Sequence, residues 1–151
     1  MPPVPLNPST RRARLEDVPV RDVMTPDPVS VRHGVTVREA AAFLADREIG
    51  SALVFADDGR AIGVITRSDV LNAVNAGVEE RPVSQVMSPA VIAVHPDADA
   101  LQAFTIMARC VIGRVFVLDD DGIPVGVVSA ADLLRTLTTR WRECEAASTA
   151  F

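Results

Sequence analysis

The sequence predicts an α+β fold built from two gapless β-α-β-β-α repeats that pack about a pseudo-twofold axis. The first observation is an internal duplication: residues 20–74 align with residues 83–137 at a constant offset of 63 positions, and 17 of the 55 aligned pairs are identical. The second is an Asp-Gly dipeptide between two apolar runs in each copy, a strong signal for a β-hairpin. A unit of about 55 residues buries too little surface to be stable alone, so we expect the copies to pack on each other and form two related clefts.

Each repeat is expected to contribute three strands. The first is short and lies near residues 29–31 in one copy and 91–94 in the other. The other two form the hairpins, with "ALVFA" and "AIGVIT" joined through Asp58-Gly59, and "VFVL" and "PVGVVS" joined through Asp121-Gly122.

The first helix of each repeat is expected over residues 37–48 and 100–110, where apolar residues recur at helical spacing. The residues that precede these helices have the spacing of a capping box, which stabilises a helix N-terminus. The pairs are Thr36 with Glu39 and Asp99 with Gln102.

The last helix of each repeat is expected to begin at Asp69 or Asp132 as N-cap, and Gly77 to end the first copy. In the second copy the helical pattern continues further, with one apolar stripe at spacings of three and four. Its members are Ala130, Leu134, Leu137, Trp141 and Cys144. This stripe predicts a homodimer, with packing onto the chain's own surface as the alternative.

We divide the chain into an N-terminal tail (1–18), a first repeat (19–80), a second repeat (81–146) and a C-terminal tail (147–151). The two repeats together are expected to form one globular module. The first tail is rich in proline and arginine, which is typical of a flexible segment, and it lacks the apolar core of a secretory signal.

Composition excludes several function classes. The net charge of −5 and the absence of a long apolar run argue against nucleic-acid and membrane partners. There is no lysine, His33 and His95 are the only histidines, and Cys110 and Cys144 do not form a CxxC metal site. We therefore expect no metal site built on histidine, no catalytic constellation and a reducing, cytoplasmic setting.

The duplicated motif is "GVITRSD" at residues 63–69 and "GVVSAAD" at residues 126–132. A purely structural interpretation is that the glycines ease strand geometry and the aspartates cap helices. The functional interpretation is that free N–H groups at the helix start and the hydroxyl of Thr66 or Ser129 bind phosphate, while the carboxylate accepts hydrogen bonds from a ribose diol. Phosphate and diol recognition together indicate a nucleotide.

The two copies resemble tandem CBS domains, a family named after cystathionine β-synthase, in which these domains regulate and do not catalyse. The resemblance is carried by "VRDVMTPDPVSV" with "IGSALVFADDGRAIGVITRSDVL", and by "VSQVMSPAVIAV" with "IGRVFVLDDDGIPVGVVSAADLL". It covers roughly residues 19–140. It implies a CBS pair that binds AMP, ADP or ATP, or else S-adenosylmethionine or NAD, between the repeats. It implies no required cofactor and leaves dependence on Mg²⁺ open.

By this resemblance the aspartate binds ribose, the Ser or Thr faces phosphate, and the base lies against the other repeat. The first cleft is then formed by Thr66, Arg67, Asp69, Pro89, Val91, Ile92, Ile112, Gly113, Arg114, Val115 and Phe116. The second cleft is formed by Ser129, Asp132, Pro26, Pro28, Val29, Ile49, Gly50, Ser51, Ala52 and Leu53. Many family members have proline in the second strand, where this chain has Leu53 and Phe116, which leaves the base preference open.

Arginines distinguish the two clefts. Arg67 and Arg114 are expected on opposite walls of the first cleft, where the second has Ala130 and Ser51. Because a guanidinium suits phosphate oxygens, we expect the Thr66/Asp69 cleft to prefer phosphorylated ligands.

Three functions remain open: a free-standing regulatory module that senses adenosine nucleotides, a structural or interaction module with vestigial clefts that acts through dimerisation, and an enzyme. Both aspartates and both hydroxyls are present, which favours the first. The absence of lysine and of paired histidines counts against the third. Any output is expected to act through another protein, an effector whose identity is unknown.

Overall fold

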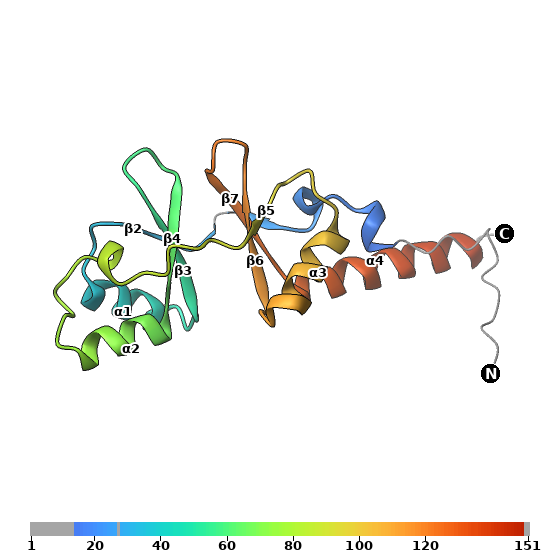
Figure 1. Cartoon of the computed structure of the whole chain (residues 1–151). Helices are drawn as coiled ribbons and strands as arrows, with labels where there is room; N and C mark the ends of the chain where they lie inside the picture. Colours follow the sequence, from blue (N-terminus) through green and yellow to red (C-terminus); the bar gives the residue numbers. More distant parts are fainter. Residues whose placement is uncertain (1–13, 27, 150–151) are drawn as a thin grey trace.

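Two β-sheets lie side by side in the middle of the molecule, with a pair of helices on the outer side of each (Figure 1). The computed structural model describes residues 14–26 and 28–149. The first half of the chain contains the 3-10 helices η1 (Leu15–Asp17) and η2 (Val20–Asp22), strands β1 (Thr25–Pro26), β2 (Ser30–Arg32), β3 (Ser51–Phe55) and β4 (Ala61–Thr66), and helices α1 (Val37–Asp46) and α2 (Arg67–Asn75). The second half contains η3 (Val83–Gln85), strands β5 (Ala93–Val94), β6 (Arg114–Leu118) and β7 (Pro124–Ser129), and helices α3 (Ala100–Cys110) and α4 (Ala130–Thr149). The predicted α+β class and the β-α-β-β-α order are confirmed.

Both hairpins form as predicted. Strands β3 and β4 are antiparallel, as are β6 and β7, while β2 and β5 add parallel strands at the edges. Gly59 and Gly122 turn the hairpins with φ of 85° and 78°, in the left-handed region that favours glycine. The two hairpins are also joined at their turns, where the Ala61 N–H donates a hydrogen bond to the Gly122 carbonyl at 3.0 Å.

The N-termini of α1 and α3 form largely as predicted. Thr36 and Glu39 make a complete capping box before α1. Before α3, Asp99 accepts a hydrogen bond from the Gln102 N–H at 2.8 Å, which is the N-cap half of the motif.

The predicted start of the last helices is wrong by one turn. The N-cap of α2 is Thr66, and Asp69 is the third residue of the helix. Thr66 accepts from the Asp69 N–H, and Asp69 accepts from the Thr66 N–H, so the aspartate completes a capping box and does not cap the helix itself. At the other end, Gly77 follows the C-cap with φ 72°, as predicted for a helix stop.

The repeats exchange their first segments, which we call the crossing segments (residues 20–26 and 83–89). Val83 is buried in the first core, formed by β2, β3, β4, α1 and α2, whereas Val20 and Val23 are buried in the second core, formed by β5, β6, β7, α3 and α4. Strand β1 pairs with β7, and the reciprocal bridge joins Val64 to Ser88. Each core therefore needs residues from both repeats, which explains why neither unit is expected to fold alone.

Gly63 and Gly126 lie where the crossing segments pass over the hairpins. A Cβ on Gly63 would lie 2.5 Å from the Met87 Sδ and 2.7 Å from the Ser88 carbonyl oxygen, and one on Gly126 would lie 2.6 Å from the Met24 Sδ. These glycines let the crossing segment approach the strand closely. The structural interpretation that they only ease strand geometry is therefore incomplete.

The boundaries of the expected tails change. Residues 1–13 lie outside the described residues, but residues 14–18 are not a flexible tail: Leu15 packs against the second core and Val18 is fully buried in it. At the other end, α4 continues to Thr149, beyond the expected boundary at residue 146.

Candidate functional site

The Thr66/Asp69 motif lies at the junction of β4 and α2. Asp69 Oδ2 accepts hydrogen bonds from the Thr66 N–H at 3.0 Å and from the Ser88 hydroxyl at 3.3 Å. The Thr66 Oγ1 accepts from the Asp69 N–H at 3.1 Å, so the hydroxyl proton of Thr66 remains available for a ligand oxygen. Ser88 belongs to a crossing segment, and the motif is therefore held by both repeats.

The Ser129/Asp132 motif repeats this geometry at the junction of β7 and α4. Asp132 Oδ2 accepts from the Ser129 N–H at 2.8 Å, and the Ser129 Oγ accepts from the Asp132 N–H at 3.2 Å. The other carboxylate oxygen of Asp132, Oδ1, accepts from Arg135 Nη2 at 2.5 Å. Asp132 is the buried member of the pair, with 8% of its surface exposed.

The helix start offers fewer free N–H groups than the sequence suggests. The Arg67 N–H donates to the Gly50 carbonyl at 3.1 Å, and the Asp69 N–H is used by Thr66. Two of the first three N–H groups of α2 are therefore already used. A phosphate here would depend on the Thr66 hydroxyl and on nearby side chains more than on a row of free amides.

A cavity of about 360 Å³ opens beside Thr66, between the two repeats. Four of its side chains carry hydroxyl or guanidinium groups and the rest are apolar or glycine, an arrangement that suits a flat apolar ring bearing polar substituents. The lining residues are Ser51, Val64, Thr66, Ser88, Ala90, Ile92, Ile112, Gly113, Arg114 and Phe116.

Six of the residues predicted for the first cleft line this cavity: Thr66, Ile92, Ile112, Gly113, Arg114 and Phe116. Asp69, Pro89 and Val91 do not line it, although Asp69 is hydrogen-bonded to Ser88, which does.

Three residues assigned to the clefts have side chains that lie elsewhere, and their part in binding stays a prediction. Side chains alternate along a strand, so Phe116 faces the cavity while its neighbour Val115 points into the second core. For the same reason Ala52 is buried in the first core and does not face a cleft. Arg67 is exposed and does not line the cavity.

Four lining residues are absent from the list predicted for this cleft: Ser51, Val64, Ser88 and Ala90. Ser51 was assigned to the other cleft but lines this cavity. Val64 lies two positions before Thr66 on β4 and so faces the same side, a signal that strand alternation provides. Ser88 could not be found in this way, because it reaches the cavity only through the crossing segment.

The structure shows where some of the residues predicted for the second cleft lie. Pro26 pairs with Gly126 in the β1–β7 ladder, which brings the first crossing segment beside the strand that ends at Ser129. Leu53, the counterpart of Phe116, is fully buried on β3, and Ile49 packs against the first core. Residue 27, in the same expected wall, lies outside the described residues.

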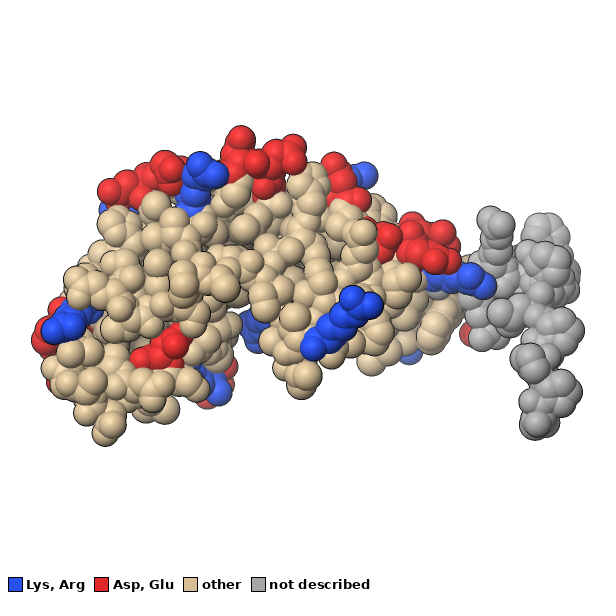
Figure 2. Space-filling model, viewed as in Figure 1, with Lys and Arg blue, Asp and Glu red and all other residues tan. Residues whose placement is uncertain are grey.

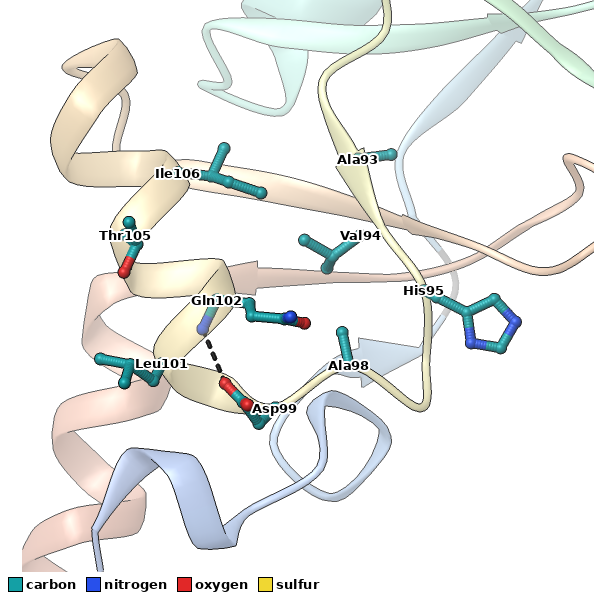
Figure 3. Close-up of a pocket in the computed structure, with 9 residues that line it drawn as sticks. All are labelled: Ala93, Val94, His95, Ala98, Asp99, Leu101, Gln102, Thr105 and Ile106. Atoms are coloured by element: carbon teal, nitrogen blue, oxygen red, sulfur yellow. Dashed lines mark hydrogen bonds between the residues drawn. The ribbon is translucent and has the colours of Figure 1, made fainter.

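A groove of about 540 Å³ between β5 and α3 is larger than the cleft cavity (Figure 3). Its walls come from one repeat, and they include Ala93, Val94 and Ile106. Asp99 at its edge is already bonded to the Gln102 N–H, and His95 points away from the helix. Because the groove does not include the duplicated motif and is formed by one repeat alone, we place the candidate site in the Thr66 cavity, which both repeats line.

Acidic side chains follow the edge where both hairpin loops project (Figures 1 and 2). The loops contribute Asp57, Asp58, Asp119, Asp120 and Asp121. His33 and His95 pair with two of them, with Nε2 3.0 Å from Asp57 and 2.7 Å from Asp120. Across residues 14–26 and 28–149, no three His, Cys, Asp or Glu side chains are grouped to hold a metal ion, and no helix could span a bilayer.

The model of the CBS domain matches this chain twice, at residues 20–76 and 83–139. The chain belongs to the CBS domain family. The prediction of a CBS pair is therefore confirmed, and the two matches coincide with the two repeats.

A relative and two solved structures illustrate the similarity. An uncharacterised protein of Methanocaldococcus jannaschii is 30% identical over 130 residues, which is 86% of this chain but 41% of that protein. A CBS domain protein from Pyrobaculum aerophilum, complexed with AMP, is 29% identical with a TM-score of 0.67, over 81% of this chain and 99% of that chain. The CBS domain pair of protein MJ0100, in complex with 5′-methylthioadenosine and S-adenosyl-L-methionine, is 25% identical with a TM-score of 0.66, over 79% of this chain and 98% of that chain.

Proposed function

We propose that this chain is a non-catalytic regulatory module that binds adenosine nucleotides in the clefts between its two CBS domains. The observation that carries the proposal is the Thr66–Asp69 capping box at the edge of the 360 Å³ cavity. Among the described residues, it leaves one carboxylate oxygen and one hydroxyl proton for a ligand, and the Arg114 guanidinium in the same cavity has no ion-pair partner. The preferred ligands are AMP, ADP and ATP, with S-adenosylmethionine and NAD as alternatives.

Each part of an adenosine nucleotide has a matching group in or beside the cavity. The ribose diol would donate to the free Asp69 Oδ1, and the phosphate would accept from Thr66 and Arg114. The adenine would lie against the apolar side chains of Ile92, Ile112 and Phe116, which line the cavity. The two similar structures that hold AMP and S-adenosyl-L-methionine with 5′-methylthioadenosine support this class of ligand.

The runner-up function is a structural or interaction module whose clefts are vestigial. A thermal-shift screen with AMP, ADP, ATP, S-adenosylmethionine and NAD separates the two. A ligand at 100 times its Kd stabilises the folded state by about 2.7 kcal/mol, which raises the Tm of a chain of this size by about 5–10 °C. No shift with any of the five compounds would favour the structural module.

The first cleft is proposed to select phosphorylated ligands through Arg114. Arg114 lines the cavity and has no ion-pair partner among the described residues, while Arg67 lies outside the cavity. Arg114→Ala is therefore expected to weaken ATP binding about tenfold in calorimetry and to affect adenosine much less. Arg67→Ala is the matched control and should leave both affinities unchanged; equal losses in the two variants would contradict the assignment.

We further propose that the module forms a homodimer and acts on an effector protein. Leu134 on α4 is 61% exposed, and Leu71 and Val74 on α2 are 68% and 48% exposed. Exposed apolar side chains on helices are typical of surfaces that bind another chain. A cytoplasmic location is part of the same proposal, because Cys110 is an exposed cysteine that forms no disulfide, which is typical of proteins in reducing compartments.

A further inference from the structure

The two motif aspartates differ in what holds their outer carboxylate oxygen. At Asp69, Oδ2 accepts from Thr66 and Ser88, and Oδ1 has no hydrogen-bond partner among the described residues. At Asp132, Oδ2 accepts from Ser129, and Oδ1 accepts from Arg135 Nη2 at 2.5 Å. The duplicated motif is therefore open in one repeat and closed by a cation in the other.

One position causes this difference. The residue three places after the aspartate is Asn72 in the first repeat and Arg135 in the second. Side chains three apart on a helix are neighbours, and the arginine is long enough to reach back to the carboxylate. The Arg135 side chain is 74% exposed while that of Asp132 is 9% exposed, so the guanidinium meets the carboxylate from the solvent side.

We propose that Arg135 is a specificity-determining residue that closes the Ser129/Asp132 cleft to the diol of a nucleoside. This inference rests on the proposed function. A diol donates its hydrogens to carboxylate oxygens, and in Asp132 one oxygen is held by Ser129 and the other by Arg135. A ligand at this cleft must displace or share Arg135, whereas Asp69 Oδ1 needs no such rearrangement. Nucleosides and nucleotides therefore fill the Thr66/Asp69 cleft first.

The test exchanges the residues that the two repeats have at this position. Arg135→Asn gives the second repeat the residue of the first, and Asn72→Arg does the reverse. Each cleft is measured alone, in Asp69→Ala for the second cleft and in Asp132→Ala for the first. The probe is adenosine, which has the diol but no phosphate, so a lost attraction between arginine and phosphate does not affect the result.

Calorimetry is expected to show that Arg135→Asn strengthens adenosine binding at the second cleft about three- to tenfold. Asn72→Arg is expected to weaken it at the first cleft by a similar factor. The affinity for 2′,3′-dideoxyadenosine, which lacks both hydroxyls, should not change in either variant. This dependence on the diol would not arise if Arg135 only stabilised the helix.

Two outcomes would overturn the proposal, and they are distinguishable. If the unmodified chain binds adenosine but Arg135→Asn leaves the second cleft unchanged or weaker, the role of Arg135 is wrong and the proposed function stands. If the unmodified chain binds neither adenosine nor AMP, the proposed function itself fails. Because the Arg135 side chain is largely exposed, its variant should fold normally, which an unchanged Tm would verify.

Discussion

At the scale of single residues, Asp69 combines a structural and a proposed binding role. Asp69→Ala removes the hydrogen bonds from Thr66 and Ser88, which should cost about 1 kcal/mol of unfolding free energy. It also removes the group proposed to bind ribose, so AMP affinity at this cleft should fall about 10- to 100-fold in calorimetry.

Glu39→Ala is the matched control for this substitution. Glu39 occupies the same capping-box position in α1, where it accepts from the Thr36 N–H, but its partner Thr36 does not line the cavity, whereas Thr66 and Ser88, the partners of Asp69, do. It should lower the Tm by a similar amount and leave AMP binding intact. If Asp69→Ala also melts earlier yet binds AMP normally, the motif is a helix cap and nothing more.

A second residue-scale prediction concerns Gly63. An added Cβ would come within 2.7 Å of the Ser88 carbonyl oxygen, which is backbone and cannot turn aside. Gly63→Ala should therefore displace the crossing segment and lower stability by about 1–3 kcal/mol in denaturant unfolding. Because Ser88 lines the cavity, nucleotide binding should weaken as well.

Gly34 provides the comparison, since a Cβ there would meet no atom within 4 Å. Gly34→Ala should leave stability and binding nearly unchanged. Equal stability in the two alanine variants would show that the crossing segment moves without cost.

At the scale of elements, local signals predict what lies within a few residues, and the structure agrees there. The Thr36–Glu39 box, the hairpin glycines and the stop at Gly77 each depend on neighbours in sequence. The start of α2 was misplaced because Thr66 and Asp69 can both cap a helix, and their separation suits either choice.

The exchange of crossing segments could not be predicted in this way. Val20 and Val83 are the same residue at equivalent positions, so the apolar pattern does not reveal which repeat each one joins. The resemblance to CBS domains did assign Pro89 of the crossing segment to the first cleft, but not Ser88, the residue before it, which lines the cavity. By contrast, side chains alternate along a strand, so of the neighbours Val115 and Phe116, both assigned to the cleft, only one side chain can face it.

The end of α3 carries a strained residue. Val111 has φ 53°, a left-handed conformation that is costly for a β-branched side chain, and it is 89% exposed, so packing does not compensate. Val111→Asn should therefore raise the unfolding free energy by about 1 kcal/mol, which is about 2–4 °C in Tm by scanning calorimetry.

Glu48 follows α1 at the equivalent position, also with φ 53°. Its side chain is unbranched, so Glu48→Asn should gain less stability than Val111→Asn. A loss of stability in Val111→Asn would mean that this side chain makes a contact in an assembly that the single chain does not show.

At the scale of the whole molecule, α4 is where the symmetry of the two repeats breaks. It extends well beyond the body of the molecule, while α2 stops at Asn75 (Figure 1). Its buried face includes Leu133, and the predicted stripe lies beside that face: Leu134 is 61% exposed and Trp141 is 37% exposed. Trp141 and Leu137 border a hollow with Leu15, so part of the stripe does pack near the chain's own surface.

The homodimer proposal can therefore be tested at two positions on one helix. Leu134→Ala removes little from a single chain, because that side chain is mostly in solvent, so any loss of association belongs to the interface. A central apolar contact typically contributes about 1–2 kcal/mol, and the dimer Kd should rise about 5- to 30-fold in sedimentation equilibrium.

Trp141→Ala should weaken the dimer as well and also lower the Tm, because it uncovers the hollow beside Leu15. Thr139→Ala, exposed on another side of α4, should change neither quantity. A chain that stays monomeric at tens of micromolar would reject the dimer, and the stripe would then serve to bind the effector directly.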